Sequence, residues 1–227
     1  MMRAAVVRDL VALGGATVIA CATLAGQASR PTELLPVDEA VQRPEFFTFR
    51  AHLQAAVARR DWTALLAVVH PNIRNSFGPD EGLTTFREQW REGAPDSPIW
   101  SELGAVLALG GSFDAGGSFV APYVFSRWPG SRDAFEHVAV AGSRVRVRAS
   151  ARPDADVLAI VSYAILPRAR AGGVLLTDDE GRWTSVALPD GRAGYVAARY
   201  ARSPIDYRAI FSEASGRWQM MAFVAGD

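Results

Sequence analysis

Apolar residues after position 36 recur every three or four positions, which is the period of an amphipathic helix. The pattern predicts a first helix over residues 37–60 and further helices over residues 83–93 and 97–109. The apolar face of the first helix is formed by Phe46, Phe49, Leu53 and Val57. Short strands are expected between these helices, so residues 37–137 are predicted to form an α+β domain.

Two smaller signals refine this α+β prediction. Asp61 is a suitable N-cap for another short helix, which Pro71 would end. Residues 116–130 are rich in aromatic and β-branched residues and are expected to form a strand. Pro122 within that run favours a sheet edge or a β-bulge, because proline cannot donate a ladder hydrogen bond.

From residue 138 the apolar period changes from helical to two, which is typical of half-buried strands. Valine and arginine alternate over residues 145–148, and a β-branched run follows at residues 157–166. Asp190-Gly191 lies between two strand-like segments and is a strong hairpin signal. Short strands at such close intervals predict a small all-β barrel over residues 138–203.

The last segment, residues 204–227, alternates again and predicts a β-hairpin with its turn at Ala214-Ser215-Gly216. Our hypothesis is that this hairpin returns to complete the sheet of the first domain. The β-barrel of residues 138–203 would then be an insertion in an α+β fold.

Charge supports the division into two domains and gives no support to one class of partner. All 24 basic residues are arginine and they balance 24 acidic residues, so the net charge gives no support to a nucleic-acid partner. Residues 22–137 carry a net charge of −4 and residues 138–203 a net charge of +4. A biased codon usage explains the absence of lysine better than a demand for arginine at every site.

The N-terminal residues predict export. Arg3 and Arg8 precede an apolar run that is too short to span a membrane but fits a signal peptide over residues 1–20. The sequence Val18-Ile19-Ala20-Cys21 resembles a bacterial lipobox, which implies lipidation of Cys21 and a tether over residues 21–36. The alternative is an ordinary cleavage near Ala25 or Ala28. Either way the protein is expected outside the cytoplasm, in the periplasm or as an outer-membrane-attached lipoprotein.

Short motifs follow one another in a fixed order within residues 138–203. They are Val145-Arg146-Val147-Arg148, Pro153, Trp183-x-x-Val186, Asp190-Gly191-x-x-Gly194-Tyr195-Val196 and Tyr200. Together they resemble the bacterial SH3-like (SH3b) domain. Arg146 stands in place of the family's usual Asn and Tyr195 in place of its usual Trp, and residues 168–182 align poorly.

The resemblance implies a shallow groove for peptide, peptidoglycan or a protein partner. The ligand-binding candidates are Trp183, Tyr195, Tyr200 and Arg146, although Trp183 and Tyr195 are equally suited to fill a core. The remainder of the chain faintly resembles the cone-shaped fold of nuclear-transport-factor-2-like proteins. In that comparison residues 207–223 correspond to the final strand pair.

No catalytic, metal or cofactor site is predicted. The three histidines are isolated, and Cys21 lies in the predicted signal region, so the cysteine peptidase chemistry often fused to SH3-like domains is excluded. Glu88 and Glu92 are spaced like neighbours on a solvated helix face.

The leading interpretation is an exported, non-enzymatic binding or accessory protein of the envelope. The alternative is a small-ligand binder or enzyme in a cone-shaped first domain, with Asp61, Trp62 and His70 as weak candidates.

Overall fold

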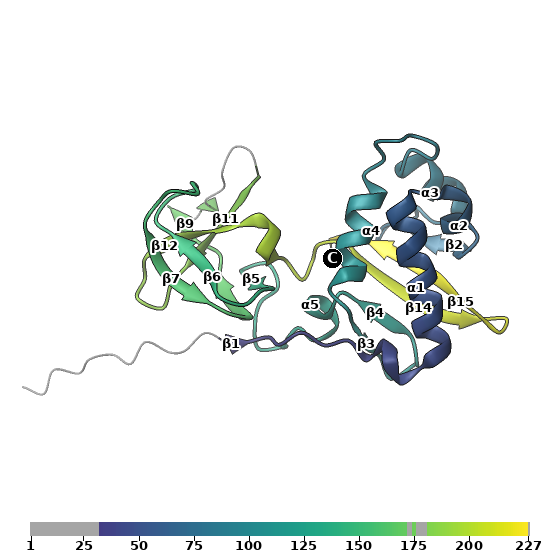
Figure 1. The fold of residues 1–227 in the computed structure, drawn as a ribbon, viewed down its shortest axis with the longest axis horizontal. Helices are drawn as coiled ribbons and strands as arrows, with labels where there is room; N and C mark the ends of the chain where they lie inside the picture. Colours follow the sequence, from purple (N-terminus) through teal and green to yellow (C-terminus); the bar gives the residue numbers. More distant parts are fainter. Residues whose placement is uncertain (1–31, 172–173, 176–180, 227) are drawn as a thin grey trace, which may run out of the picture.

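The computed structural model of the chain describes residues 32–171, 174–175 and 181–226. The predicted signal peptide and Cys21 lie outside these residues. The protein is a mixed α+β fold with mostly antiparallel sheets, and no helix among the described residues is long and apolar enough to cross a membrane. Figure 1 shows the strands of residues 137–202 on one side, here called the β-rich lobe. The other side, the helical lobe, comprises residues 38–121 and 207–224.

The helices of the helical lobe follow the predicted apolar pattern. They are η1 (Glu39–Gln42), α1 (Pro44–Arg59), α2 (Trp62–Leu66), α3 (Leu83–Gln89) and α4 (Ile99–Ala108). The predicted face of α1 is confirmed, because Phe46, Leu53 and Val57 are buried. The helix begins later than predicted, at Pro44, since proline is favoured in the first turn where its missing N–H has no partner to lose. Asp61 caps α2, as predicted, by accepting a 3.0 Å hydrogen bond from the backbone of Ala64.

A five-stranded sheet packs against these helices, in the strand order β2-β15-β14-β4-β3. Its members are β2 (Val69–Arg74), β3 (Ser112–Phe113), β4 (Phe119–Ala121), β14 (Arg208–Ala214) and β15 (Arg217–Val224). The predicted hairpin is present as β14 and β15, and its turn residues Ser215 and Gly216 both have positive φ. β14 pairs antiparallel with β4, and β15 pairs parallel with β2, so the hairpin occupies the middle of the sheet.

One strand prediction in this lobe is wrong in its extent. β4 ends at Ala121, and a short helix, α5 (Tyr123–Ser126), follows Pro122. β4 lies between β14 and β3, so it is not an edge strand. Pro122 instead stands just beyond the strand, where the ladder needs no further N–H donor.

The β-rich lobe has two four-stranded antiparallel sheets, in the orders β1-β8-β5-β13 and β11-β12-β6-β7. Its elements are β1 (Thr32–Glu33), β5 (His137–Val140), β6 (Val145–Arg148), β7 (Val157–Val161), β8 (Ala164–Pro167), β9 (Arg170–Ala171), β10 (Val174–Leu175), β11 (Trp183–Ala187), β12 (Ala193–Ala197), η2 (Ala198–Tyr200) and β13 (Ala201–Arg202). The described strands do not close into a continuous barrel. The two sheets share an apolar core and are linked by the isolated bridge between Arg168 and Val186.

Two glycines of the Asp-Gly motif have different roles in this lobe. Gly191 has a φ of +83°, which fits the predicted turn. Gly194 is required for space rather than for φ, since a Cβ there would lie 2.5 Å from Cγ1 of the buried Val147. β12 therefore approaches β6 more closely than any residue with a side chain would allow.

The two lobes meet around the segment that enters the described structure. Thr32 and Glu33 pair with Ile165 and Ala164 of β8, so the last part of the predicted tether is a strand rather than a free linker. Leu34 is buried in a small apolar cluster together with Tyr123, Val124, Ala139 and Ile165. Residues 32–34 of the predicted tether thus have backbone pairing and apolar burial, and residues 21–31 lie outside the described structure.

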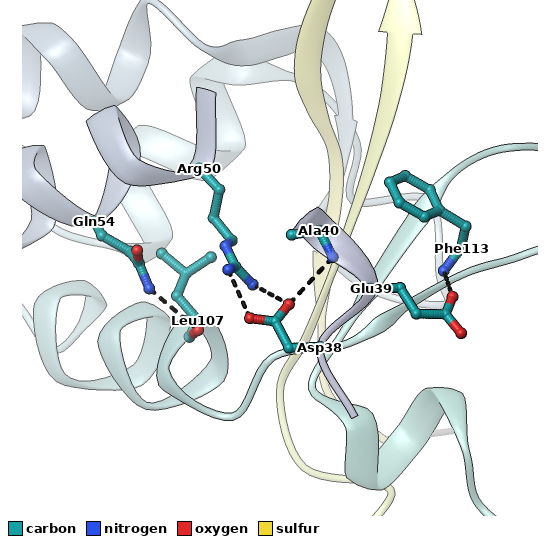
Figure 2. A network of polar contacts seen from close by, with 7 residues as sticks. All are labelled: Asp38, Glu39, Ala40, Arg50, Gln54, Leu107 and Phe113. Atoms are coloured by element: carbon teal, nitrogen blue, oxygen red, sulfur yellow. Dashed lines mark hydrogen bonds and ion pairs between the residues drawn. The ribbon is translucent and has the colours of Figure 1, made fainter. Parts of the chain in front are cut away.

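An ion pair then fixes the same segment to the helical lobe (Figure 2). The buried guanidinium of Arg50 on α1 donates to both carboxylate oxygens of Asp38, at 2.6 and 2.7 Å. Asp38 also caps η1 through the backbone N–H of Ala40, and the neighbouring Glu39 accepts from the backbone of Phe113 at 2.9 Å. The segment is therefore held by charge-assisted bonds on both sides of η1.

Changing Asp38 to Asn leaves the buried Arg50 without its counter-charge. We expect the free energy of unfolding to fall by about 2 kcal/mol, below the range for fully buried pairs because the carboxylate is partly exposed. Urea unfolding followed by circular dichroism measures this. Asp154→Asn is the control, because the Arg152–Asp154 pair is exposed and its loss should not be detectable. Equal effects of both changes would contradict the assigned role of Asp38.

Changing Gly194 to Ala tests the close approach of β12 to β6. The added methyl group overlaps Val147, and we expect a loss of about 2 kcal/mol in the free energy of unfolding. Gly130→Ala is the matched control, since a Cβ there meets no atom within 4 Å. Thermal unfolding of the two variants compares them, and an unchanged midpoint for Gly194→Ala would show that the strands can separate without cost.

Candidate functional site

A groove of about 330 Å³ lies on the outer side of the sheet that contains β6, β11 and β12. It is lined by Ser143, Arg144, Val145, Arg146, Arg148, Pro153, Trp183, Ala197, Arg199 and Tyr200. We call it the arginine groove. Its walls come from three segments that are far apart in sequence, namely residues 143–153, the start of β11 and the end of β12 with η2.

Strand periodicity explains why these side chains face outward. Val145 and Val147 of β6 point into the core of the lobe and are buried, so Arg146 and Arg148 point to the opposite face. β11 and β12 place Trp183 directly opposite Ala197. Because alanine is small, this pairing leaves the face of the sheet hollow beside the indole ring.

Three of the four predicted ligand-binding residues come together here. Arg146, Trp183 and Tyr200 all line the arginine groove. The fourth, Tyr195, does not line it. Tyr195 is half-buried on β12, two positions before Ala197, where it pairs with Ser185 of β11 and Arg148 of β6. Tyr195 therefore lies on the same face of the strand but beyond the groove.

The groove is strongly positive. Four of its lining residues are arginines and none is acidic. Arg148 donates through Nη1 to the carbonyl of Ala155 at 2.6 Å, and the guanidinium of Arg199 lies 4.8 Å from the centre of the Tyr200 ring. Among the described residues, the side chains of Arg144 and Arg146 make no hydrogen bond or ion pair.

A carboxylate close to the groove in sequence does not neutralise it. Asp154 follows the groove residue Pro153 and accepts two hydrogen bonds from Arg152, at 3.0 and 2.6 Å. These bonds lower the pKa of the Asp154 carboxyl below its ordinary value, and the charge of Arg148 lowers it further. The negative charge of Asp154 is thus already matched by Arg152, an arginine outside the groove.

Sequence reasoning did not single out Arg144, Arg148 and Arg199 as site residues. A signal for Arg148 was present, because Arg146 and Arg148 alternate with valines on one strand and therefore share a face, whereas Arg144 precedes the strand and has a φ of +53°. Arg199 follows the end of β12, and only the fold brings the single turn η2 to this groove.

The helical lobe has two open surface hollows, one of about 470 Å³ between α1 and α4 and one of about 340 Å³ between α1 and the start of β15, and a single arginine lines each of them. The space between α1 and the sheet is filled by aromatic rings, with Phe46 lying 4.4 Å from Phe119 and 4.7 Å from Trp218 between ring centres. Two weak candidates for chemistry in this lobe have local backbone roles. Asp61 caps α2, and Nδ1 of His70 accepts from the backbone N–H of Asn72.

Within residues 32–171, 174–175 and 181–226, no three His, Cys, Asp or Glu side chains gather to hold a metal ion. No model of a known protein family matches the chain, and no curated protein shows significant similarity to it. The arginine groove is therefore the candidate site on the strength of its own geometry and charge.

Substitutions of groove residues should lower the stability of the fold less than substitutions in the core behind the groove. Tyr200 is 38% exposed, so we expect Tyr200→Ala to lower the free energy of unfolding by less than about 1 kcal/mol. Val196 is fully buried on the other face of β12, and Val196→Ala should cost about 2 kcal/mol. Urea unfolding compares the two variants. A larger loss for Tyr200→Ala would mean that the tyrosine is a structural residue.

Proposed function

We propose that this protein is an exported binding or accessory protein of the bacterial envelope. In this proposal the β-rich lobe is an SH3-like module, and its arginine groove holds a peptide, either free or within peptidoglycan. The helical lobe carries the module and contributes no catalysis. In this lobe, helices pack on a sheet that the C-terminal hairpin completes. We propose that its fold is related to the cone-shaped fold of nuclear-transport-factor-2-like proteins.

One observation carries the proposal. Arg146, Trp183 and Tyr200 were selected from separate motifs of one resemblance, and the fold brings all three to one groove. Side chains chosen only as core filler would not be expected to gather on the outer face of a sheet. Aromatic rings beside arginines are also the residues that dominate binding energy at protein interfaces.

Two features of the sequence support the envelope as the site of action. The N-terminal residues resemble a lipoprotein signal ending at Cys21, which would attach the protein to a membrane. Residues 138–203 carry a net charge of +4, which favours association with the anionic polymers of a cell wall. A lipid anchor and a wall-binding lobe would together hold the protein between the membrane and the wall.

Co-sedimentation of the full-length chain with purified cell-wall sacculi tests the proposal. We expect the wild type to sediment, and a Trp183→Ala, Tyr200→Ala double variant to bind at least about tenfold more weakly, because it loses both aromatic walls of the groove. Phe135→Ala is the control, since Phe135 is 51% exposed and does not line the groove. A folded wild type that stays in the supernatant would overturn the wall-binding proposal.

A further inference from the structure

Two arginines of the arginine groove carry positive charge that no carboxylate among the described residues matches. Several other arginine side chains of the lobe are matched by carboxylates. Examples are the pairs Arg152–Asp154, Arg170–Glu136 and Arg192–Asp190, with distances of 2.6 to 2.7 Å. Among the described residues, Arg144 and Arg146 have no such partner, although they lie on the same lobe. Their guanidinium groups are thus available to an anion from outside.

The other two arginines of the groove are held in place by the protein. The backbone carbonyl of Ala155 holds Nη1 of Arg148, and the Tyr200 ring supports the Arg199 guanidinium from one side. The close approach of Tyr200 to the chain depends on Gly142, where a Cβ would lie 3.3 Å from the tyrosine ring. Arg148 and Arg199 therefore add positive charge at fixed positions beside Arg144 and Arg146, which favours an anionic ligand.

The size and walls of the groove limit the ligand. A volume of about 330 Å³ is at the small end of ligand pockets, so the groove accommodates a few atoms of a chain rather than a long stretch. Trp183 and Tyr200 provide flat surfaces for an organic body beside the charges. A bare inorganic ion would leave these aromatic walls unused, whereas the end of a peptide would contact both walls and charges.

We propose that the arginine groove binds the terminal carboxylate of a peptide, with Arg144 and Arg146 donating to its oxygens and Trp183 and Tyr200 contacting its last residue. Arginine forks match the planar geometry of a carboxylate and form two parallel hydrogen bonds to it. This inference rests on the proposed function, because it names the part of the peptide that the same groove recognises.

A set of N-acetylated dipeptides tests this inference, with the last residue varied from glycine to aromatic and each peptide made as the free acid and as the amide. Binding to the full-length chain is followed by nuclear magnetic resonance at millimolar peptide. We expect the acids to shift the signals of residues 143–148 and 197–200 in a saturable way. The matching amides should bind at least about tenfold more weakly, because they lack the charge that the arginines recognise.

Substitutions identify the groups responsible. Arg146→Gln should weaken binding of the acids about tenfold, and Arg146→Lys should weaken it less, because lysine keeps the charge but not the fork. Arg192→Gln is the matched control, since it removes the same charge from an arginine that is already paired with Asp190, and neither residue lines the groove. It should leave binding of the acids unchanged, and an equal loss in both Gln variants would reduce the effect to net charge and overturn the assignment.

The remaining outcomes are also decisive. Amides that bind as well as acids would overturn the carboxylate assignment. Inorganic phosphate is added as a competitor. If its affinity equals that of the acids, the groove is a general oxyanion site, and the peptide end is overturned as the ligand. If no acid binds, the inference fails, while sedimentation with sacculi still decides the proposed function. If the acids bind in the groove but the protein does not co-sediment with sacculi, the carboxylate inference stands and the wall-binding proposal is overturned.

Discussion

The helical lobe depends on backbone pairing between segments from opposite parts of the chain. β14 and β15 come after the entire β-rich lobe, and yet they supply the central strands of the five-stranded sheet. Without them, β2 has no neighbour and the short β3–β4 pair has lost its partner on one side. The apolar core of the lobe would then lose Phe211, Trp218 and Phe223. Contacts with such long sequence separation raise the contact order, so this lobe should fold slowly.

The apolar spacing along the sequence predicted helices and strands well where an element buries one face in a core. The apolar spacing of α1 and the alternation in β14 and β15 are examples, since each has one face in a core. The pairing of Thr32 and Glu33 with β8 was missed because two residues carry no periodicity, and their structure arises from a distant partner. The short helix α5 was missed because its aromatic residues suit a strand equally well.

The candidate site also combines residues that the sequence indicates with limits that only the fold sets. The resemblance to the SH3-like domain indicated four residues. The fold brings Arg146, Trp183 and Tyr200 to one groove, whereas Tyr195 lies beyond it. The sequence could place Tyr195 on a strand but not locate the end of the hollow, which is set by the small side chain of Ala197 opposite Trp183. The chain has 24 arginines, so their number says little about function. What distinguishes the groove is that two of its arginines have no carboxylate partner among the described residues.

Within residues 137–202 of the β-rich lobe, the first and last strands, β5 and β13, are neighbours in one antiparallel sheet, where Arg202 is opposite Ala139. The chain therefore enters and leaves this lobe at nearly the same point, about 5 Å apart at the paired Cα atoms. A unit with adjacent ends can be carried within a loop of another protein without stretching its host. During evolution such a unit can be gained, lost or exchanged between hosts as a single cassette. The helical lobe would then need only a short turn between α5 and β14 to remain connected.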